Sequence, residues 1–342
     1  MKAIVLHRNG GAEQMKYQDI ATPKVGRGEV LVRVRAAGVN HVDIDIRNGI
    51  SGMEGNFPHI PGVDAAGDVA EVGAGVTQWK KGDRVAPHFI LNCGICPNCV
   101  RGMENICHSF GILGATQWGT YADYVKVKEH HLVRIPDKLS YDQAVSAYVP
   151  FATAWEALIT VGKLSAGETC LVNAAGSGVG SAGIQVAKLA GATVIATAGS
   201  DDKLARARKL GADHTINYRK KKIGDAVLKL TGGIGVDCAL DMVGGDSLLE
   251  SIKALAQGAR LVTVGAHAGE KVEVDFVEFF RKHISLHGCG RSTRAIAANV
   301  LELAAQGKLK PVIHKKFPLR KAAEAHRLME SRKFFGRMVL NP

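Results

Sequence analysis

Several features that would assign a chain to a specialised class are missing from this sequence of 342 residues. No stretch approaches the roughly 18 consecutive apolar residues of a membrane-spanning helix. Met1 to His7 already has the pattern of a strand, so we expect no signal peptide. Internal repeats and low-complexity linkers are also missing, and no aromatic–basic surface for stacking nucleic-acid bases is evident. We therefore expect a globular protein outside the membrane, with domains that share a tight cleft.

Acidic residues and cysteines are both scarce. The sequence has 32 acidic residues against 44 basic ones, which gives a net charge of +12. Such a charge attracts nucleic acids, but it equally attracts anionic cofactors and substrates. The densest basic run, Arg219 to Lys222, follows a predicted strand, and we expect it on the solvated surface. Only seven cysteines are present, and four of them cluster, which favours a metal site over disulfides and indicates a cytoplasmic chain.

The hydrophobic pattern changes at about residue 150. Before it, strand patterns separated by turn signals lie at residues 3–8, 29–37, 68–72, 84–87 and 121–127. After it, strands at 169–173, 193–197, 214–218, 236–241, 260–264 and 284–288 alternate with helices at 179–190, 202–210, 220–230 and 246–256. This alternation predicts an α/β domain with a doubly wound, six-stranded parallel sheet and right-handed crossovers. Helices at 293–306 and 319–329 and a strand at 337–340 complete the chain.

A glycine-rich turn opens the second half of the chain. Strand residues 169–173 lead into Gly176, Ser177, Gly178, Val179 and Gly180, and a helical pattern follows at once. Glycine lets the backbone approach a phosphate closely, and the first amides of the helix point at the anion. These five residues are therefore predicted to bind the pyrophosphate of a dinucleotide. A turn without a ligand is the alternative.

Four cysteines form a compact set. Cys93, Cys96, Cys99 and Cys107 place four thiolates within fifteen residues. Four cysteines close the coordination shell of zinc, so the spacing predicts one structural Zn²⁺ with no position left for substrate. An iron–sulfur cluster or thiols that no longer bind metal are the alternatives.

The order of these motifs resembles the medium-chain dehydrogenase/reductase superfamily over nearly the whole chain. The resemblance includes Gly28–Val32, Ile60–Gly67, Gly82–Val85 and the glycine turn. It implies a GroES-like β-barrel domain at 1–149 and 289–342, with the zinc lobe at 93–107, and a Rossmann domain for NADP at 150–288. It also implies an active site in the cleft between the domains. Subunits of such proteins pair through their sixth strands, which implies a homodimer or homotetramer.

The motifs that bind catalytic zinc in alcohol dehydrogenases of this superfamily are altered here. Asn40 replaces the first cysteine, Val63 replaces the histidine, and no cysteine lies near residues 148–151. One remaining carboxylate, Asp64, does not hold a catalytic zinc. Residues 38–49, GVNHVDIDIRNG, instead resemble zeta-crystallin-like quinone oxidoreductases.

That match implies catalytic roles for Asn40, facing the nicotinamide, and for Asp43, which supports the pocket and pairs with Arg47. Asp45 stands where related reductases often carry a tyrosine, so the proton donor is open between solvent and Asp45.

Other positions concern the cofactor. The second strand of the parallel sheet ends without the acidic residue that would bind the ribose 2′-hydroxyl of NAD. Ser200 and Lys203 are able to bind a 2′-phosphate there, so we expect NADP(H). The resemblance to quinone reductases of the superfamily implies that Tyr218 covers the adenine. The resemblance adds five cofactor contacts, at His41, Thr153, Val243, Gly265 and Arg337. The remaining histidines, including His130, His131 and His326, are expected on the surface.

These observations predict an NADPH-dependent reductase of quinones or α,β-unsaturated carbonyl compounds that works without catalytic zinc. Hydride addition to a conjugated system needs less help than alcohol oxidation, because hydrogen bonds stabilise the charge that spreads onto oxygen. One alternative is an alcohol dehydrogenase or aldehyde reductase with an atypical metal site built from His41, Asp43 and Asp64. Another is a non-catalytic NADPH-binding protein that binds RNA.

Overall fold

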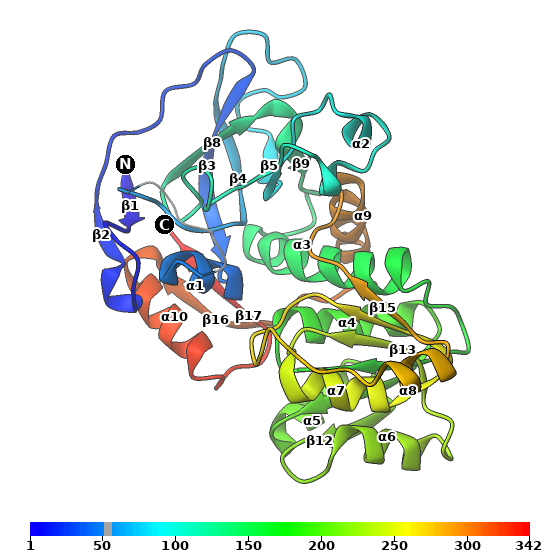
Figure 1. Cartoon of the computed structure of the whole chain (residues 1–342). Coiled ribbons are helices and arrows are strands. Elements are labelled where there is room, and N and C mark those ends of the chain that lie inside the picture. The colour runs from blue at the N-terminus through cyan, green and yellow to red at the C-terminus, as the bar shows by residue number, and fades with distance from the viewer. Residues whose placement is uncertain (51–56) are drawn as a thin grey trace. The chain divides into compact units, whose positions relative to one another are not determined.

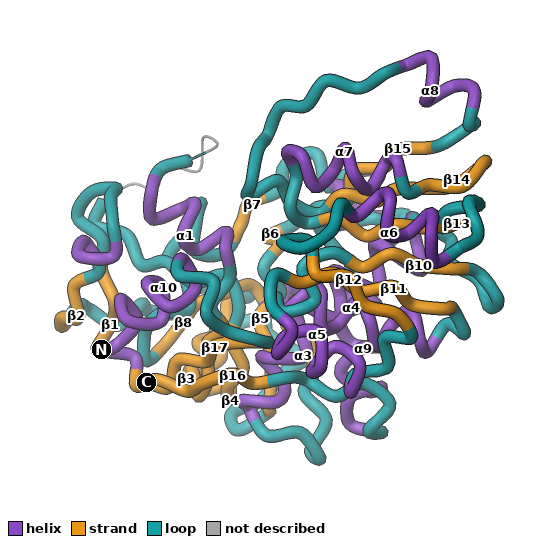
Figure 2. Tube along the Cα trace, turned by 90° about the horizontal axis from the view of Figure 1, so that it is seen from below, coloured by secondary structure: helices purple, strands orange, loops and turns teal. Residues whose placement is uncertain are grey.

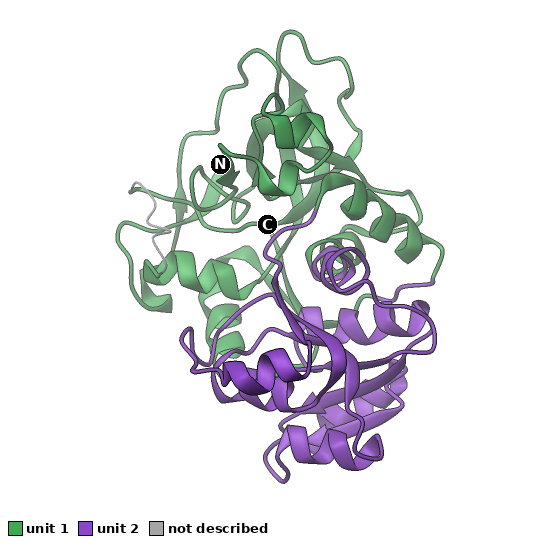
Figure 3. Ribbon diagram, turned by 45° about the vertical axis from the view of Figure 1, so that its right-hand side comes forward, with its two compact units in different colours: residues 1–149, 293–307, 311–342 green, residues 150–292, 308–310 purple. Residues whose placement is uncertain are grey.

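The computed structural model describes residues 1–50 and 57–342. They form two units, one of residues 1–149, 293–307 and 311–342, and one of residues 150–292 and 308–310 (Figure 3). We call them unit 1 and unit 2. The second unit begins at residue 150, inside helix α3 (Tyr141–Trp155). Residues 289–292 and 308–310, which we expected in the first domain, lie with unit 2.

Unit 1 is built around a seven-stranded sheet. Its main path runs β16-β17-β3-β4-β5-β9, and β8 pairs with β3. In β3 most side chains are buried while Arg33 and Arg35 are exposed, which fits a strand at the centre of a sheet. The strands of unit 1 are β1 (Lys2–Val5), β2 (Lys16–Asp19), β3 (Glu29–Gly38), β4 (Ala65–Val72), β5 (Arg84–Pro87), β6 (Ile90–Leu91), β7 (Gly111–Ile112), β8 (Tyr124–Lys128), β9 (Leu132–Arg134), β16 (Ile313–Pro318) and β17 (Arg337–Asn341). Its helices are α1 (His41–Asn48), α2 (Pro97–Val100), α9 (Arg294–Ala305) and α10 (Ala322–Glu330).

The end of the chain returns to this sheet. Strand β17 pairs antiparallel with β3, with Val339 opposite Gly38, and it pairs parallel with β16. Helix α10 lies beside α1 (Figure 1). The return therefore brings Arg337 and His326 next to the segment that starts at Gly38.

Unit 2 contains the predicted doubly wound sheet. All its strand pairs are parallel and their order is β12-β11-β10-β13-β14-β15. The strands are β10 (Thr169–Val172), β11 (Thr193–Ala198), β12 (His214–Asn217), β13 (Val236–Asp241), β14 (Leu255–Thr263) and β15 (Ser285–Gly288). Helices α4 (Gly178–Leu189) and α5 (Asp201–Lys209) cover one face, and α6 (Ile223–Leu230) and α7 (Gly245–Lys253) cover the other (Figure 2). The prediction of this fold is confirmed.

Helix α3 continues into a π-helical turn, Glu156–Val161. Together they form one stretch, Tyr141–Val161, that is long and apolar enough to cross a membrane, and its most apolar window of 18 residues has a mean hydropathy of 1.3. Within its most apolar window, 67% of the residues are buried inside the protein, as in a core helix. The sequence predicts no membrane span, because the criterion is an unbroken apolar run and Asp142 and Glu156 interrupt this stretch.

Candidate active site, nucleotide turn and metal centre

The glycine turn follows β10 directly. Ala174 adopts a left-handed φ of 48°, which turns the chain sharply after the strand. Ser177 is the N-cap of α4, and its hydroxyl oxygen accepts a hydrogen bond from the Gly180 amide at 2.8 Å. Gly178 and Val179 open the helix, so their amides point beyond its start, where an anion binds.

Two glycines of this turn have different surroundings. A Cβ built on Gly180 would lie 2.2 Å from the carbonyl oxygen of Ala174, so only glycine permits this approach of helix and strand. A Cβ built on Gly176 would meet Cδ of Lys203 at 2.9 Å, a flexible side chain that can move. The turn therefore has the close packing that a dinucleotide site requires, and Lys203 lies over it.

Turns at the carboxyl ends of the neighbouring strands are tied to this one. Buried Asn173 donates to a carboxylate oxygen of Asp241 at 2.7 Å and accepts from the Thr197 hydroxyl at 2.9 Å. The other oxygen of Asp241 accepts hydrogen bonds from the amides of Val243 and Gly244. The ends of β10, β11 and β13 thus form one rigid edge, the position at which doubly wound sheets bind their ligands.

Basic side chains surround the turn after β11, and the acidic residue Asp201 that follows it is paired. Asp201 is neutralised by Lys220 at 2.6 Å and accepts from the Asn217 side chain at 2.7 Å. Above Gly199, a Cβ would meet Oη of Tyr218 at 2.6 Å and Nε of Arg219 at 3.2 Å. Arg219 belongs to the exposed basic run, which we had treated as surface chemistry only.

The four clustered cysteines converge. Their sulfur atoms all lie within 4.8 Å of one another, and adjacent pairs are 3.5 to 3.9 Å apart. Four sulfurs bound to one zinc at about 2.3 Å stand roughly 3.8 Å apart, so the cluster fits a tetrahedral site. Among residues 1–50 and 57–342, this is the one group of three or more metal-ligating side chains that converges in this way.

A second polar cluster surrounds the start of α1. Asn40 is the N-cap, and its backbone amide donates to Asp43 at 2.7 Å in a capping box. The other oxygen of Asp43 accepts from the Val63 amide at 3.0 Å, and Tyr121 donates its hydroxyl to Asp43 at 3.0 Å. Asp43 and Tyr121 are fully buried.

The Asn40 side chain joins this carboxylate to an ion pair. Its amide nitrogen donates to Asp64 at 3.0 Å and lies 3.4 Å from Asp43, while its oxygen accepts from Arg337 at 2.5 Å. Arg337 also donates to Asp64 at 2.7 Å and to the Val39 carbonyl at 3.0 Å. Both ends of the Asn40 carboxamide are therefore bound, and Arg337 and Asp64 form a buried ion pair.

Burial dominates the acid–base properties of this cluster. Burial, followed by the charge of Asp64, raises the pKa of Asp43 to about 7. Burial also raises the pKa of Asp64, although the guanidinium of Arg337 opposes that shift. The pKa of Tyr121 lies well above its ordinary value because the side chain is buried beside Asp43.

Arg47 lies on the other side of the cluster. It donates to Glu330 at 2.5 Å and to the Gly10 carbonyl at 3.0 Å, and it contacts Nδ1 of His326 at 3.3 Å. The connection from Arg47 to Asp43 therefore runs through His326 and Tyr121, instead of the direct pair that we expected.

The prediction that His131 and His326 lie on the surface is wrong. Their exposed fractions are 5% and 0%. Burial lowers the pKa of His131 to about 4 and that of His326 to about 3. A signal for His326 was present, because Ala322, Ala325, His326 and Met329 share the buried face of α10.

The remaining predicted cofactor contacts are dispersed along the chain. Val243 and Gly265 follow β13 and β14 at the same edge as the glycine turn. His41 is the first residue of α1, and Thr153 is a half-buried residue of α3. Sequence reasoning missed Arg219, Asn173 and Asp241, whose importance depends on contacts between different strands.

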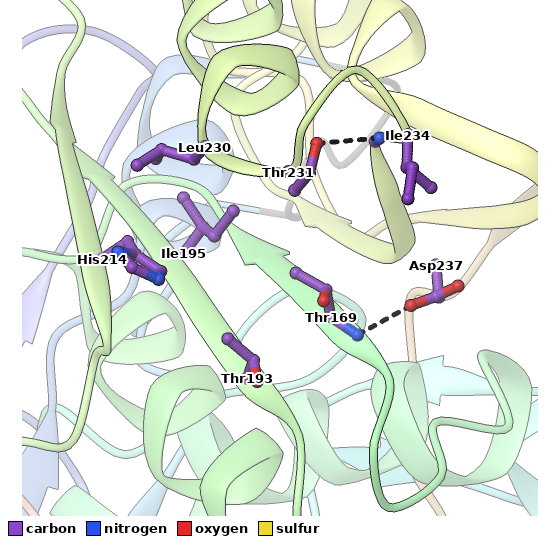
Figure 4. Close-up of a pocket in the computed structure, with 9 residues that line it drawn as sticks. Thr169, Thr193, Ile195, His214, Leu230, Thr231, Ile234 and Asp237 are labelled. Carbon is purple, nitrogen blue, oxygen red and sulfur yellow. Dashed lines mark hydrogen bonds between the residues drawn. The ribbon is translucent and has the colours of Figure 1, made fainter.

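A pocket of about 320 Å³ lies at the opposite edge of the unit 2 sheet (Figure 4). Thr169, Thr193 and His214, which line it, begin β10, β11 and β12. It is therefore at the amino ends of the strands and does not belong to the nucleotide edge.

Comparisons with known proteins agree with this architecture. Residues 26–137 match the family model for the alcohol dehydrogenase GroES-like domain, and residues 178–306 match that for zinc-binding dehydrogenases. A quinone oxidoreductase of Sus scrofa is 32% identical over 99% of this chain and 97% of its own length. An alcohol dehydrogenase of Geobacillus stearothermophilus is 31% identical over 99% of both chains. The crystal structure of an NAD-dependent alcohol dehydrogenase has a TM-score of 0.96 and 41% identity, with complete coverage of both chains. The chain thus belongs to the medium-chain dehydrogenase/reductase superfamily and is an oxidoreductase of that family.

Proposed function

We propose that this protein is an NADPH-dependent reductase that transfers hydride to quinones or α,β-unsaturated carbonyl compounds without a catalytic zinc. The observation that carries the proposal is that both ends of the Asn40 carboxamide are hydrogen-bonded to neighbouring side chains. It bridges Asp43, Asp64 and Arg337 in the segment where zinc-dependent relatives would place a cysteine ligand. The neighbouring Val63 is apolar and buried, and it offers no ligand atom.

The donor set around Asp43 and Asp64 argues against a metal at this point. Asp43 accepts hydrogen bonds from two backbone amides and the Tyr121 hydroxyl, and Asp64 accepts from Asn40 and Arg337. A divalent cation would have to displace these donors and approach the guanidinium of Arg337. Without such a Lewis acid, acceptors whose charge spreads over a conjugated system are favoured.

The residues after β11 support NADPH as the cofactor. NADPH, when bound, supplies the hydride. Lys203, Tyr218 and Arg219 gather around Gly176 and Gly199, and Ser200 caps α5 beside them. A 2′-phosphate carries negative charge, which these side chains attract, and the ion pair of Asp201 with Lys220 reduces the repulsion from that carboxylate.

In this proposal the glycine turn binds the pyrophosphate, and Thr153, Val243, Gly265 and His41 contribute further cofactor contacts. Arg337, predicted as a phosphate contact, serves first as the partner of Asp64. Asn40 acts as a fixed part of the pocket, since both ends of its carboxamide are bound. The proton that completes the reduction comes from solvent or from Asp45.

We further propose one structural zinc on the four cysteines, a cytoplasmic location and a homodimer or homotetramer. The sulfur geometry supports the zinc, and the clustered free cysteines fit a reducing compartment. The outer strand β15 supports the dimer, because Leu286 is 43% exposed on it, and Phe276 and Phe280 of the preceding helix α8 (Phe276–Arg281) are 72% and 62% exposed. Sedimentation of the wild type and of Leu286→Lys tests this part, with a monomer of the wild type as the contrary result.

A second candidate is an alcohol dehydrogenase, which the names of two similar proteins favour. A substrate panel separates the two. Quinones, enones, enoyl thioesters and aldehydes are assayed by consumption of NADPH or NADH, with and without a zinc chelator. We expect turnover of quinones or enones that the chelator leaves unchanged. Turnover confined to aldehydes, stopped by the chelator and restored by zinc, would establish the second candidate instead.

The cofactor preference has its own test. We expect Lys203→Ala and Arg219→Ala to lower kcat/KM for NADPH at least tenfold and that for NADH less than threefold. Lys209→Ala, at the far end of α5, is the matched control and leaves both unchanged. Equal catalytic efficiency of the wild type with NADH and NADPH contradicts the assignment.

A further inference from the structure

A buried chain of hydrogen bonds links the C-terminal helix α10 to the start of α1. Arg47 lies 3.3 Å from Nδ1 of His326, Nε2 of His326 lies 3.2 Å from the Tyr121 hydroxyl, and that hydroxyl lies 3.0 Å from Asp43. The exposed fractions of these four side chains do not exceed 1%. His326 lies outside both matched family models, and Tyr121, inside the first of them, belongs to none of the motifs assigned from the sequence.

The direction of each bond in this chain follows from Arg47. A guanidinium has only donors, so Nδ1 of His326 must present a lone pair to it. A neutral imidazole then carries its hydrogen on Nε2 and donates it to the oxygen of Tyr121. A doubly protonated ring would direct an N–H group at the guanidinium, and burial and Arg47 both oppose that state.

The hydroxyl of Tyr121 has one hydrogen and two acceptors within reach. Asp43 is 3.0 Å away, and the Gly38 carbonyl is 3.5 Å away. Because His326 already donates to the hydroxyl oxygen, the hydrogen is free to point at Asp43, which is the closer acceptor and is charged above its pKa of about 7. Asp43 is then surrounded by donors, namely the amides of Asn40 and Val63 and the Tyr121 hydroxyl, and these stabilise its carboxylate form.

The chain is not a path for protons. Arg47 does not lose its proton in proteins, so a proton leaving Asp43 through Tyr121 would stop at His326. The chain of hydrogen bonds instead fixes the direction of each bond from Arg47 to Asp43, and Asp43 in turn holds Asn40. The other charged or titratable groups around this chain are Asp64 and Arg337 beside Asn40, Glu330 on Arg47, and His41 near His326.

We propose that His326 is a positioning residue, which Arg47 holds as the Nε2–H tautomer so that Tyr121 and Asp43 fix Asn40, chiefly through its backbone amide, at the start of α1. Its consequence for turnover rests on the proposed function. The tautomer of His326 and the position of the Asn40 side chain do not depend on the proposed function, and both are measured without any substrate.

The direct test is nitrogen NMR of the full-length, zinc-loaded protein with ¹⁵N-labelled histidine. His326→Gln identifies the signal of residue 326. We expect a neutral ring with its proton on Nε2 from pH 5.5 to 8. A proton on Nδ1, or an imidazolium within this range, overturns the proposal.

The seat of Asn40 is followed by its side-chain amide signal in ¹⁵N-asparagine-labelled protein. Glutamine offers an acceptor and a donor that replace the two ring nitrogens, so His326→Gln leaves the signal within a linewidth of its wild-type position. His326→Leu, which offers neither, displaces it. His214→Gln, on the pocket at the amino edge of unit 2, is the control and leaves the signal unmoved. An unmoved signal in His326→Leu, or an equal displacement in His326→Gln, overturns the proposal.

Kinetics with NADPH and a quinone provide the functional readout. We expect His326→Leu to lower kcat at least tenfold, with KM for NADPH within threefold, and to shift the pH profile of kcat. His326→Gln retains at least a third of wild-type kcat. A uniform loss in both variants indicates a structural role only and contradicts positioning. Failure of the wild type to reduce any quinone or enone refutes the proposed function and leaves the two NMR results to decide this inference.

Discussion

Replacing Arg337 with methionine removes the positive partner of a fully buried carboxylate. Asp64 has an exposed fraction of 0%, and its ion pair with Arg337 is 2.7 Å long. Methionine fills much of the volume but leaves Asp64 without its cation. Losing one member of a buried pair costs about 3–5 kcal/mol, because the remaining charge is left in a medium of low polarity.

The size of this loss depends on pH, and its sign follows from the pKa of Asp64. The folded-state pKa is already raised above the ordinary 3.8 by burial, and removing Arg337 raises it further. The folded state then binds a proton more tightly than the unfolded state, so the free energy of unfolding falls as the pH rises above 3.8. Protonation limits the penalty to about 1.4 kcal/mol for each pH unit above that value, or roughly 1.6 kcal/mol at pH 5 and 4.4 kcal/mol at pH 7.

Urea unfolding at pH 5, 6 and 7 measures this loss. Trp79 and Trp118 lie in unit 1 and Trp155 in unit 2, so a Trp155→Phe background confines the fluorescence to unit 1. Adding Asp64→Asn to Arg337→Met removes the stranded charge of Asp64 and so reduces both the loss and its pH dependence.

Arg35→Met is the matched control, because Arg35 pairs with Asp68 at 2.6 Å but is 41% exposed. It loses less than about 1 kcal/mol. A loss in Arg337→Met that is equal at pH 5 and pH 7, or that Asp64→Asn does not reduce, would refute this account of the site.

Three further substitutions test other parts of the structure. Cys107→Ser lowers the metal content from one zinc per chain towards zero, whereas Cys289→Ser, outside the cluster, keeps it; equal zinc in both variants contradicts the site. Gly180→Ala weakens NADPH binding at least tenfold in a titration, because its Cβ meets the Ala174 backbone, while Gly176→Ala, which meets only the Lys203 side chain, changes it less than threefold. His326→Gln removes a buried histidine whose pKa is lowered to about 3, so that in the wild type acid protonates this residue mainly in the unfolded state. Acid therefore destabilises the variant less than the wild type. As the pH falls below 6.5, the stability difference shifts by about 1.4 kcal/mol per pH unit in favour of the variant; a constant difference would be contrary.

The fold was predictable because its signals are local. Strand β10, the glycine turn and helix α4 follow one another within 21 residues, and hydrophobic periodicity identifies each of them. Helix α1 was not predicted, since Val42, Ile44 and Ile46 alternate as in a strand. What makes it a helix is the capping box of Asn40 and Asp43, which outweighs that alternation.

The candidate site was predictable only in part, because its contacts join distant segments. The cysteine spacing and Asn40 were visible as motifs. The pairing of Asp64 with Arg337 spans 273 residues and depends on the register of β17 against β3, which no pattern within either strand reveals. Likewise, the sequence predicts Arg219 to be a surface charge without a role, because only the fold brings it close to Gly199.

The sequence separation within the Asn40 cluster also has a consequence for folding. Asp43 and Asp64 are buried in the first quarter of the chain, but the cation that pairs with Asp64 and the histidine that directs Tyr121 come from residues 326–337. Burying either carboxylate before those groups arrive would strand a charge, so unit 1 cannot complete its core until the C-terminal return is in place. Unit 2 is almost contiguous, from 150 to 292, and all its strand pairs except β10 with β13 join consecutive strands. Since shorter loops close faster, amides of β10 and β11 should gain protection in pulse-labelled hydrogen exchange before those of β3 and β17. Simultaneous protection of both sheets during refolding would show that the buried charges do not govern the order of assembly.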